Sequence, residues 1–150
     1  MGYTLTVGEI EFGHPLGAAV AHLTAGRILM SGQIVPVTVE QAPAFPNDYL
    51  PRMNKRVPSY GEWSVFCKAV GLYDLFYGEL LKPHPGIVPI TERHTQAIVA
   101  ARTRYQQIHP HARACFGYSM DDEHLARLMW LEWWFQWACA NCRRPGICNR

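Results

Sequence analysis

The sequence predicts an α+β protein, with a small antiparallel sheet formed by residues 1–40 and packed on a helical C-terminal part. Alternation of apolar and polar residues is concentrated early in the chain, whereas helical periodicity and helix caps dominate later. Strands clustered first and helices clustered later are typical of the α+β class. A chain of 150 residues has the usual size of one domain. We therefore expect one domain, β-rich over 1–40, a Pro-rich loop over 41–58 and helical over 59–150.

The composition favours a substantial core, because 49% of the residues are apolar and 17% are charged. A net charge of +2 is too small to indicate a nucleic-acid partner. The most apolar stretch, residues 125–140, contains Arg127, Glu132 and Gln136, so we expect no membrane span. Five cysteines, an odd number, and the lack of a signal-peptide pattern favour free thiols and a cytoplasmic location.

Residues 3–12 predict the first strand. Their apolar positions alternate with a phase shift at Gly8, which predicts a β-bulge there. Residues 14–26 predict a short helix with Pro15 at its first position and Gly26 as its C-cap.

Two further strands, residues 28–30 and 33–40, flank Ser31-Gly32, a dipeptide suited to a hairpin turn. Pro36 indicates an edge strand. The side chains expected to face the core are Val35, Val37 and Val39.

Residues 41–58 show no periodicity and contain prolines at 43, 46, 51 and 58. A loop of this length in a compact domain is uncommon and is usually functional or disordered. It is therefore the first place to look for a binding site.

Helix caps predict two helices after this loop. Ser59, followed by Glu62, forms a capping box, and Gly71 is the expected C-cap of the same helix. Thr91 should cap a long helix that ends at Pro110. The residues expected on the buried faces of these helices are Trp63, Phe66, Val70, His94, Ala97, Ile98, Ala101, Tyr105 and Ile108.

Between these two helices, residues 72–77 predict a short helical piece closed by Gly78, and residues 83–86 predict a turn. At the other end of the chain, Pro145-Gly146 is expected to terminate the helical region.

The last helix should begin with Asp121 or Ser119 as its N-cap and run to about Cys139. It holds four tryptophans within eight residues and is apolar on most of its sides. An amphipathic helix shows only one apolar stripe about 100° wide. We therefore expect a central core helix or a homo-oligomer interface through residues 125–140.

The leading candidate site is the end of the Pro-rich loop together with the helix that follows it. Three cations precede the start of this helix, where unpaired N–H groups and the helix dipole favour negative charge. Two tyrosines could stack on a base or another ring. The predicted ligand-binding residues are Tyr49, Arg52, Lys55, Arg56, Ser59 and Tyr60. The alternative is a solvated basic loop that simply leads into a helix.

A zinc site is a second candidate, because Cys139, Cys142 and Cys148 supply three thiols within ten residues. Its fourth ligand could be Cys115 or a histidine such as His124. With one CxxC pair, a core residue, Cys139, and two tail thiols, Cys142 and Cys148, are the favoured account of the three cysteines.

The acidic run Asp121-Asp122-Glu123 with His124 could bind a metal or perform acid–base chemistry. Helix capping accounts for the same carboxylates. The remaining histidines, including His84 in its Pro-flanked turn, have no activating sequence context, and His94 is expected to be a hydrogen-bonded core residue.

These patterns favour a non-enzymatic protein that binds a small anionic ligand, a nucleotide or a phosphate-bearing metabolite. No Gly-x-Ser-x-Gly, Walker or Gly-x-Gly-x-x-Gly motif occurs, and no cofactor is expected except zinc at the cysteines. One alternative is an adaptor that binds proteins through the aromatic last helix. The other is a metal-dependent hydrolase or zinc-binding protein.

Overall fold

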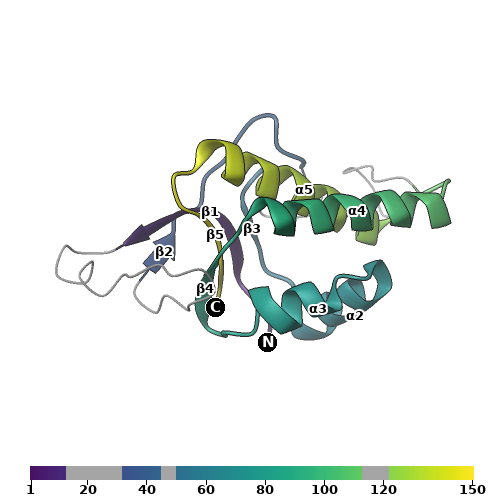
Figure 1. Ribbon diagram of the computed structural model, residues 1–150, viewed down its shortest axis with the longest axis horizontal. Coiled ribbons are helices and arrows are strands. Elements are labelled where there is room, and N and C mark those ends of the chain that lie inside the picture. Colours follow the sequence, from purple (N-terminus) through teal and green to yellow (C-terminus); the bar gives the residue numbers. More distant parts are fainter. Residues whose placement is uncertain (13–31, 45–49, 113–121) are drawn as a thin grey trace.

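The computed structural model describes residues 1–12, 32–44, 50–112 and 122–150. Within these ranges an antiparallel sheet packs beside helices (Figure 1), which confirms the α+β class. The strands are β1 (Leu5–Phe12), β2 (Gly32–Ile34), β3 (Lys55–Arg56), β4 (Gly86–Pro89) and β5 (Pro145–Asn149). The helices are α2 (Tyr60–Val70), α3 (Tyr73–Leu75), the π-helix η1 (Phe76–Leu80), α4 (Glu92–Ile108) and α5 (Glu123–Asn141).

The first strand, β1, is buried on both of its faces. Leu5 and Val7 belong to the large core that includes the helices, whereas Ile10 belongs to a second, smaller cluster. The pairing of β1 with β5 continues residue for residue through Gly8. The predicted bulge at Gly8 is therefore wrong, and the phase shift in the sequence reflects the change from one buried face to the other. The second cluster consists of Ile10, Ile34, Ile87 and Cys148.

The strand β2 pairs antiparallel with the end of β1. Gly32, expected in a hairpin turn, is instead the first residue of β2 and lies opposite Phe12. Ser31, the predicted strand over 28–30 and the predicted helix over 14–26 lie outside the described residues.

A buried asparagine fixes the segment that follows β2. Val35 is 42% exposed, so its predicted place in the core is wrong, while Val37 and Val39 are half-buried against the core. Asn54 is fully buried. Its side-chain oxygen accepts from the N–H of Val37 at 2.8 Å, and its amide nitrogen donates to the carbonyls of Val7 at 2.8 Å and Val35 at 3.2 Å. The amide of Asn54 therefore connects this segment to β1.

Three strands, β3, β4 and β5, lie outside the sheet region predicted from the sequence. The order β2-β1-β5-β4, with β3 also paired to β1, places the C-terminal strand between β1 and β4. Gly146 makes this close packing possible, because a Cβ atom there would lie 2.4 Å from Cδ1 of Ile10. The last helix ends at Asn141, so the helical region stops before Pro145 and Gly146 as predicted, but these two residues begin a central strand that the sequence did not predict.

The sequence signals of α2 are confirmed. The hydroxyl of Ser59 accepts from the N–H of Glu62 at 3.2 Å, and the carboxylate of Glu62 accepts from the N–H of Ser59 at 2.9 Å. Gly71 ends the helix with a φ of 75°, a left-handed conformation that glycine adopts without strain. Gly78, expected to close the next helical piece, lies inside η1, so that boundary is wrong.

The helices α4 and α5 lie side by side and run in opposite directions (Figure 1). Thr91 is the N-cap of α4, as predicted. Ile108 is 65% exposed in the last turn of α4, so its predicted place on the buried face is wrong. The guanidinium of Arg102 forms an ion pair with Glu132, and this pair joins α4 to α5.

The N-cap of α5 is Asp122, whose carboxylate accepts from the N–H of Leu125 at 3.0 Å. Asp121 and Ser119, the two caps predicted from the sequence, lie outside the described residues. The helix continues to Asn141, two residues beyond the predicted end at Cys139.

The helix α5 lies in the core of its own chain. Trp130 and Trp134 are 1% and 0% exposed, and the indole N–H of Trp130 donates to the carbonyl of Met53 at 2.9 Å. Trp133 and Trp137 are half-buried. These positions make α5 a central core helix, and self-association through residues 125–140 stays a prediction.

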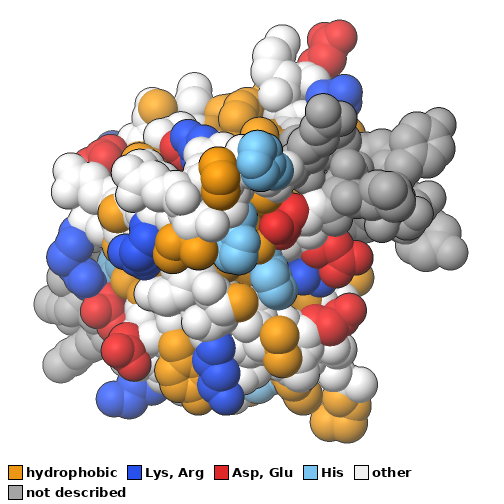
Figure 2. Space-filling model, turned by 90° about the vertical axis from the view of Figure 1, so that its right-hand side faces the viewer, with side chains coloured by type: hydrophobic (Ala, Val, Ile, Leu, Met, Phe, Trp, Pro, Cys, Tyr) orange, Lys and Arg blue, Asp and Glu red, His pale blue; other side chains and the backbone are white. Residues whose placement is uncertain are grey.

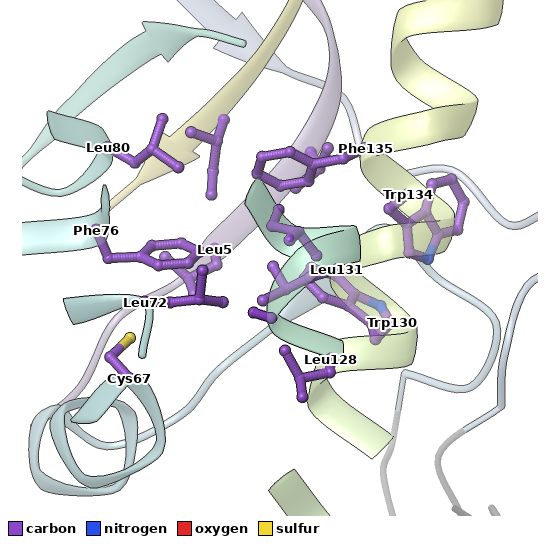
Figure 3. Close-up of a cluster of buried hydrophobic side chains, with 14 of the residues drawn as sticks. Leu5, Cys67, Leu72, Phe76, Leu80, Leu128, Trp130, Leu131, Trp134 and Phe135 are labelled. Carbon is purple, nitrogen blue, oxygen red and sulfur yellow. The ribbon is translucent and has the colours of Figure 1, made fainter. Parts of the chain in front are cut away.

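The core lies between α5, the sheet and the region of α2 and η1. In Figure 3, Leu131 and Phe135 extend from α5 toward Leu5 of β1 and Phe76 of η1. None of the helices in the described ranges has the length and hydropathy needed to cross a bilayer.

Replacing Trp134 by Ala should lower the free energy of unfolding by about 3–5 kcal/mol, because it leaves a large cavity in the core. Trp137→Ala is the matched control and should cost clearly less, since that side chain is half-buried. Urea denaturation of both variants measures the difference. Equal losses would contradict the central place of Trp134.

Candidate functional site

The start of α2, the centre of the predicted anion site, is partly closed by the chain itself. The N–H of Tyr60 donates to the carbonyl of Met1 at 3.4 Å, and the capping box occupies the N–H groups of Ser59 and Glu62. The hydrogen bond from the backbone of Ser59 holds the pKa of Glu62 below its ordinary value. Among the described residues, nothing accepts from the N–H of Gly61.

The guanidinium of Arg52 holds the backbone of the Pro-rich loop. Its Nη1 donates to the carbonyl of Glu40 at 3.0 Å and to that of Ala42 at 2.8 Å. Arg52 itself has a φ of 55°, the left-handed conformation that costs a non-glycine residue energy. Its two hydrogen bonds help to keep the loop in this form.

Arg56 also donates to backbone carbonyls of this loop, but unlike Arg52 it is buried. It is 7% exposed, its guanidinium lies 5.3 Å from the centre of the Trp130 ring, and Nη1 donates to the carbonyls of Leu50 at 2.6 Å and Lys55 at 2.7 Å. A buried loop carbonyl needs a donor, and arginine supplies several in one fixed plane.

The structure therefore divides the predicted binding residues into two groups. Ser59 and Tyr60 lie together at the start of α2, whereas Arg52 and Arg56 donate to loop carbonyls and not to these two residues. Lys55 is half-buried in β3, opposite Thr6. Tyr49 lies outside the described residues.

Tyr60 takes part in a hydrogen-bond chain that ends in the centre of the sheet. Its hydroxyl lies 3.2 Å from Nε2 of His84, and Nδ1 of His84 lies 2.5 Å from the side-chain oxygen of Asn149. Asn149 is fully buried, and its amide nitrogen donates to the carbonyls of Pro83 at 2.8 Å and Leu80 at 3.4 Å. Tyr60 is half-buried and His84 is exposed, so this series of hydrogen bonds runs from the buried Asn149 to the surface.

The partners of Asn149 determine the direction of every hydrogen bond in this chain. Two carbonyls can only accept, so they fix the amide nitrogen of Asn149 on their side and leave its oxygen facing His84. An amide oxygen can only accept, so Nδ1 of His84 must carry the proton. In neutral His84, Nε2 is then the acceptor, and Tyr60 is its O–H donor.

A group of tyrosine rings surrounds this chain. The ring of Tyr3 lies 4.7 Å from that of Tyr60, 5.0 Å from that of His84 and 6.5 Å from that of Tyr77, with large interplanar angles in each pair. Edge-to-face contacts of this kind stabilise ring orientations. They hold Tyr60 and His84 in position from residues far apart in the sequence.

Comparison of the chain with protein-family models, with curated proteins and with solved structures found no match. The functional argument therefore begins from the residues and their geometry. The Tyr60–His84–Asn149 chain is the candidate functional site of this protein.

The three C-terminal thiols do not all lie together. Cys148 lies in the second, smaller cluster, whereas Cys139 and Cys142 pack against the large core. Burial raises the pKa of all three thiols, that of Cys142 to about 11. Among the described residues, no group of three or more His, Cys, Asp or Glu side chains could hold a metal ion. Cys115 lies outside these residues.

His124, the remaining metal candidate, is half-buried between the rings of Phe66 and Tyr105. Burial tends to raise the pKa of Asp122, but hydrogen bonds from Tyr105, at 2.6 Å, and from the helix backbone lower it below its ordinary value. Figure 2 shows histidine and acidic side chains near one another on the face at the right-hand end of Figure 1. The role of Asp122 as the N-cap of α5 explains the position of its carboxylate without a metal ion.

His94 is a hydrogen-bonded core residue, as predicted. Its Nδ1 accepts from the N–H of Thr91 at 2.9 Å, so Nε2 carries the proton that goes to Glu79, also at 2.9 Å. Glu79 further pairs with Arg93 at 2.6 Å, and this hydrogen bond lowers the pKa of the Glu79 carboxyl. The network joins η1 to the start of α4.

Sequence reasoning missed the partners of Tyr60. His84 was recognised only as one histidine in a turn, and Asn149 carried no local signal. The two residues are 65 positions apart, and their contact depends on the unpredicted strand β5.

Replacing Arg56 by Ala should lower the free energy of unfolding by roughly 2–4 kcal/mol, because it removes a buried side chain that packs on Trp130 and donates to the carbonyls of Leu50 and Lys55. Arg52→Ala removes the same side chain from a more exposed place and should cost less than about 1.5 kcal/mol. Thermal or urea denaturation of the two variants tests this order. An Arg56→Ala protein with unchanged stability would contradict the structural role of Arg56.

Proposed function

We propose that this protein is a non-enzymatic binding protein for a small anionic ligand, a nucleotide or a phosphate-bearing metabolite. The site lies at the start of α2 and consists of Tyr60, Gly61 and His84. The observation that carries this proposal is the contact between the Tyr60 hydroxyl and Nε2 of His84 at an accessible surface. His84 supplies the charge that the sequence assigned to Arg52, Lys55 and Arg56.

The backbone at the start of α2 contributes a donor. A helix N-terminus carries a partial positive charge and favours anions in its first turn. Gly61 is exposed, and among the described residues nothing accepts from its N–H group. An anion could therefore approach its N–H group closely.

Protonation of His84 completes the set of donors. The Nδ1–H still donates to Asn149, and Nε2–H now donates to the oxygen of Tyr60. The phenolic O–H of Tyr60 must then turn away from the imidazole ring of His84 and can donate to a ligand. The proposed site therefore holds an anion when the His84 ring is charged.

The proposal predicts that His84→Gln weakens the binding of inorganic phosphate and of adenosine monophosphate by about tenfold to a hundredfold. The reason is the loss of the positive charge that turns the Tyr60 O–H toward the anion, so one hydrogen bond to a charged group, worth roughly 1.5–3 kcal/mol, is lost. Isothermal titration calorimetry at mildly acidic pH measures the affinity, and amide shifts of Gly61 report the location of binding.

His111→Gln is the matched control, because it removes an exposed imidazole from beyond the end of α4. It should leave the affinity unchanged. Equal effects of the two substitutions, or no phosphate binding by the unmodified protein, would refute the proposal.

A further inference from the structure

The hydroxyl of Tyr60 is hydrogen bonded to Nε2 of His84, and the other ring nitrogen of His84 is hydrogen bonded to the buried side chain of Asn149. His84 in its neutral form has its lone pair on Nε2, 3.2 Å from the oxygen of Tyr60. Asn149 prevents the other tautomer, because its oxygen requires a donor at Nδ1. A nucleophile, a base and a third group that orients the base are the parts of an activated nucleophile.

We propose that Tyr60 is a nucleophilic residue that accepts acyl groups, with His84 as its general base and Asn149 as a positioning residue. The donors are activated acyl compounds, namely acyl phosphates and acyl imidazoles. This activity is separate from anion binding, since it uses neutral His84 and does not require a charged ligand.

The step balances without any additional reagent. The oxygen of Tyr60 attacks the acyl carbonyl carbon, and the new C–O bond forms as the bond to the leaving group breaks. The phenolic proton passes to Nε2 of His84. The leaving group departs with its electron pair and takes the proton from Nε2, which restores neutral His84.

Three other described tyrosines, Tyr73, Tyr77 and Tyr105, lack this arrangement. The hydroxyl of Tyr105 donates to the carboxylate of Asp122, and burial raises the pKa of Tyr105 further from neutrality. Burial likewise raises the pKa of Tyr77. Tyr73 is 39% exposed, but no histidine or carboxylate in the described structure accepts from its hydroxyl. It is the natural internal reference, more accessible than Tyr60 and without a base.

The test is competitive acetylation of the intact protein by a limiting amount of N-acetylimidazole, with each tyrosine quantified by peptide mass spectrometry. Accessibility alone would make Tyr73 react before Tyr60. The proposal expects Tyr60 to react at least about tenfold faster than Tyr73, since a positioned general base contributes about 10²- to 10⁴-fold. A Tyr73 rate equal to or above that of Tyr60 in the unmodified protein would overturn it.

The variant His84→Gln should remove the advantage of Tyr60 and make Tyr73 the faster residue, while His111→Gln should leave the order unchanged. A preference for Tyr60 that survives in a folded His84→Gln protein would also overturn the proposal. The measurement is independent of phosphate affinity. A protein that binds phosphate but shows no Tyr60 preference therefore refutes this inference alone, and the converse result refutes the anion site alone.

Discussion

The pairing of β5 between β1 and β4 is the constraint on which the rest of the structure depends. It brings the last residues of the chain into the middle of the sheet, against its first strand. Gly146 lets this strand pass Ile10, Ile147 belongs to the large core, and Cys148 belongs to the second cluster. The sheet is therefore complete only when β5 pairs with β1. These two strands are far apart in the sequence, so their pairing costs loop entropy that the buried apolar surface must offset.

The same strand creates the candidate site. Asn149 is the last residue of β5, and its buried amide needs three hydrogen-bond partners to offset the cost of leaving water. It finds them in the carbonyls of Leu80 and Pro83 and in the ring of His84. A requirement of folding, the satisfaction of a buried amide, thus sets the tautomer of a histidine at the surface. The side chain of Asn149 therefore serves both the fold and the proposed chemistry.

Local signals in the sequence predicted local features well. Ser59 with Glu62, Thr91 and Gly71 identified helix ends correctly, because capping depends on residues only a few positions apart. The sequence did not predict β4 and β5. The strand β5 is short, begins with Pro-Gly and is stabilised by partners that are distant in the sequence. Of the predicted binding residues, Tyr60 belongs to the hydrogen-bond chain with His84 and Asn149, and Ser59 precedes it as the N-cap of α2. Charge counting pointed to Arg52 and Arg56, but it could not show that loop carbonyls would engage them.

The central claim is that Asn149 determines which nitrogen of His84 carries the proton. A long-range ¹H–¹⁵N correlation spectrum of the imidazole rings, recorded where His84 is neutral, observes this directly. The account predicts a protonated Nδ1 and an unprotonated Nε2 for His84, with His111 as the solvent-exposed reference in the same spectrum. A neutral His84 protonated at Nε2 would contradict the account, because Asn149 could not then direct the lone pair toward Tyr60.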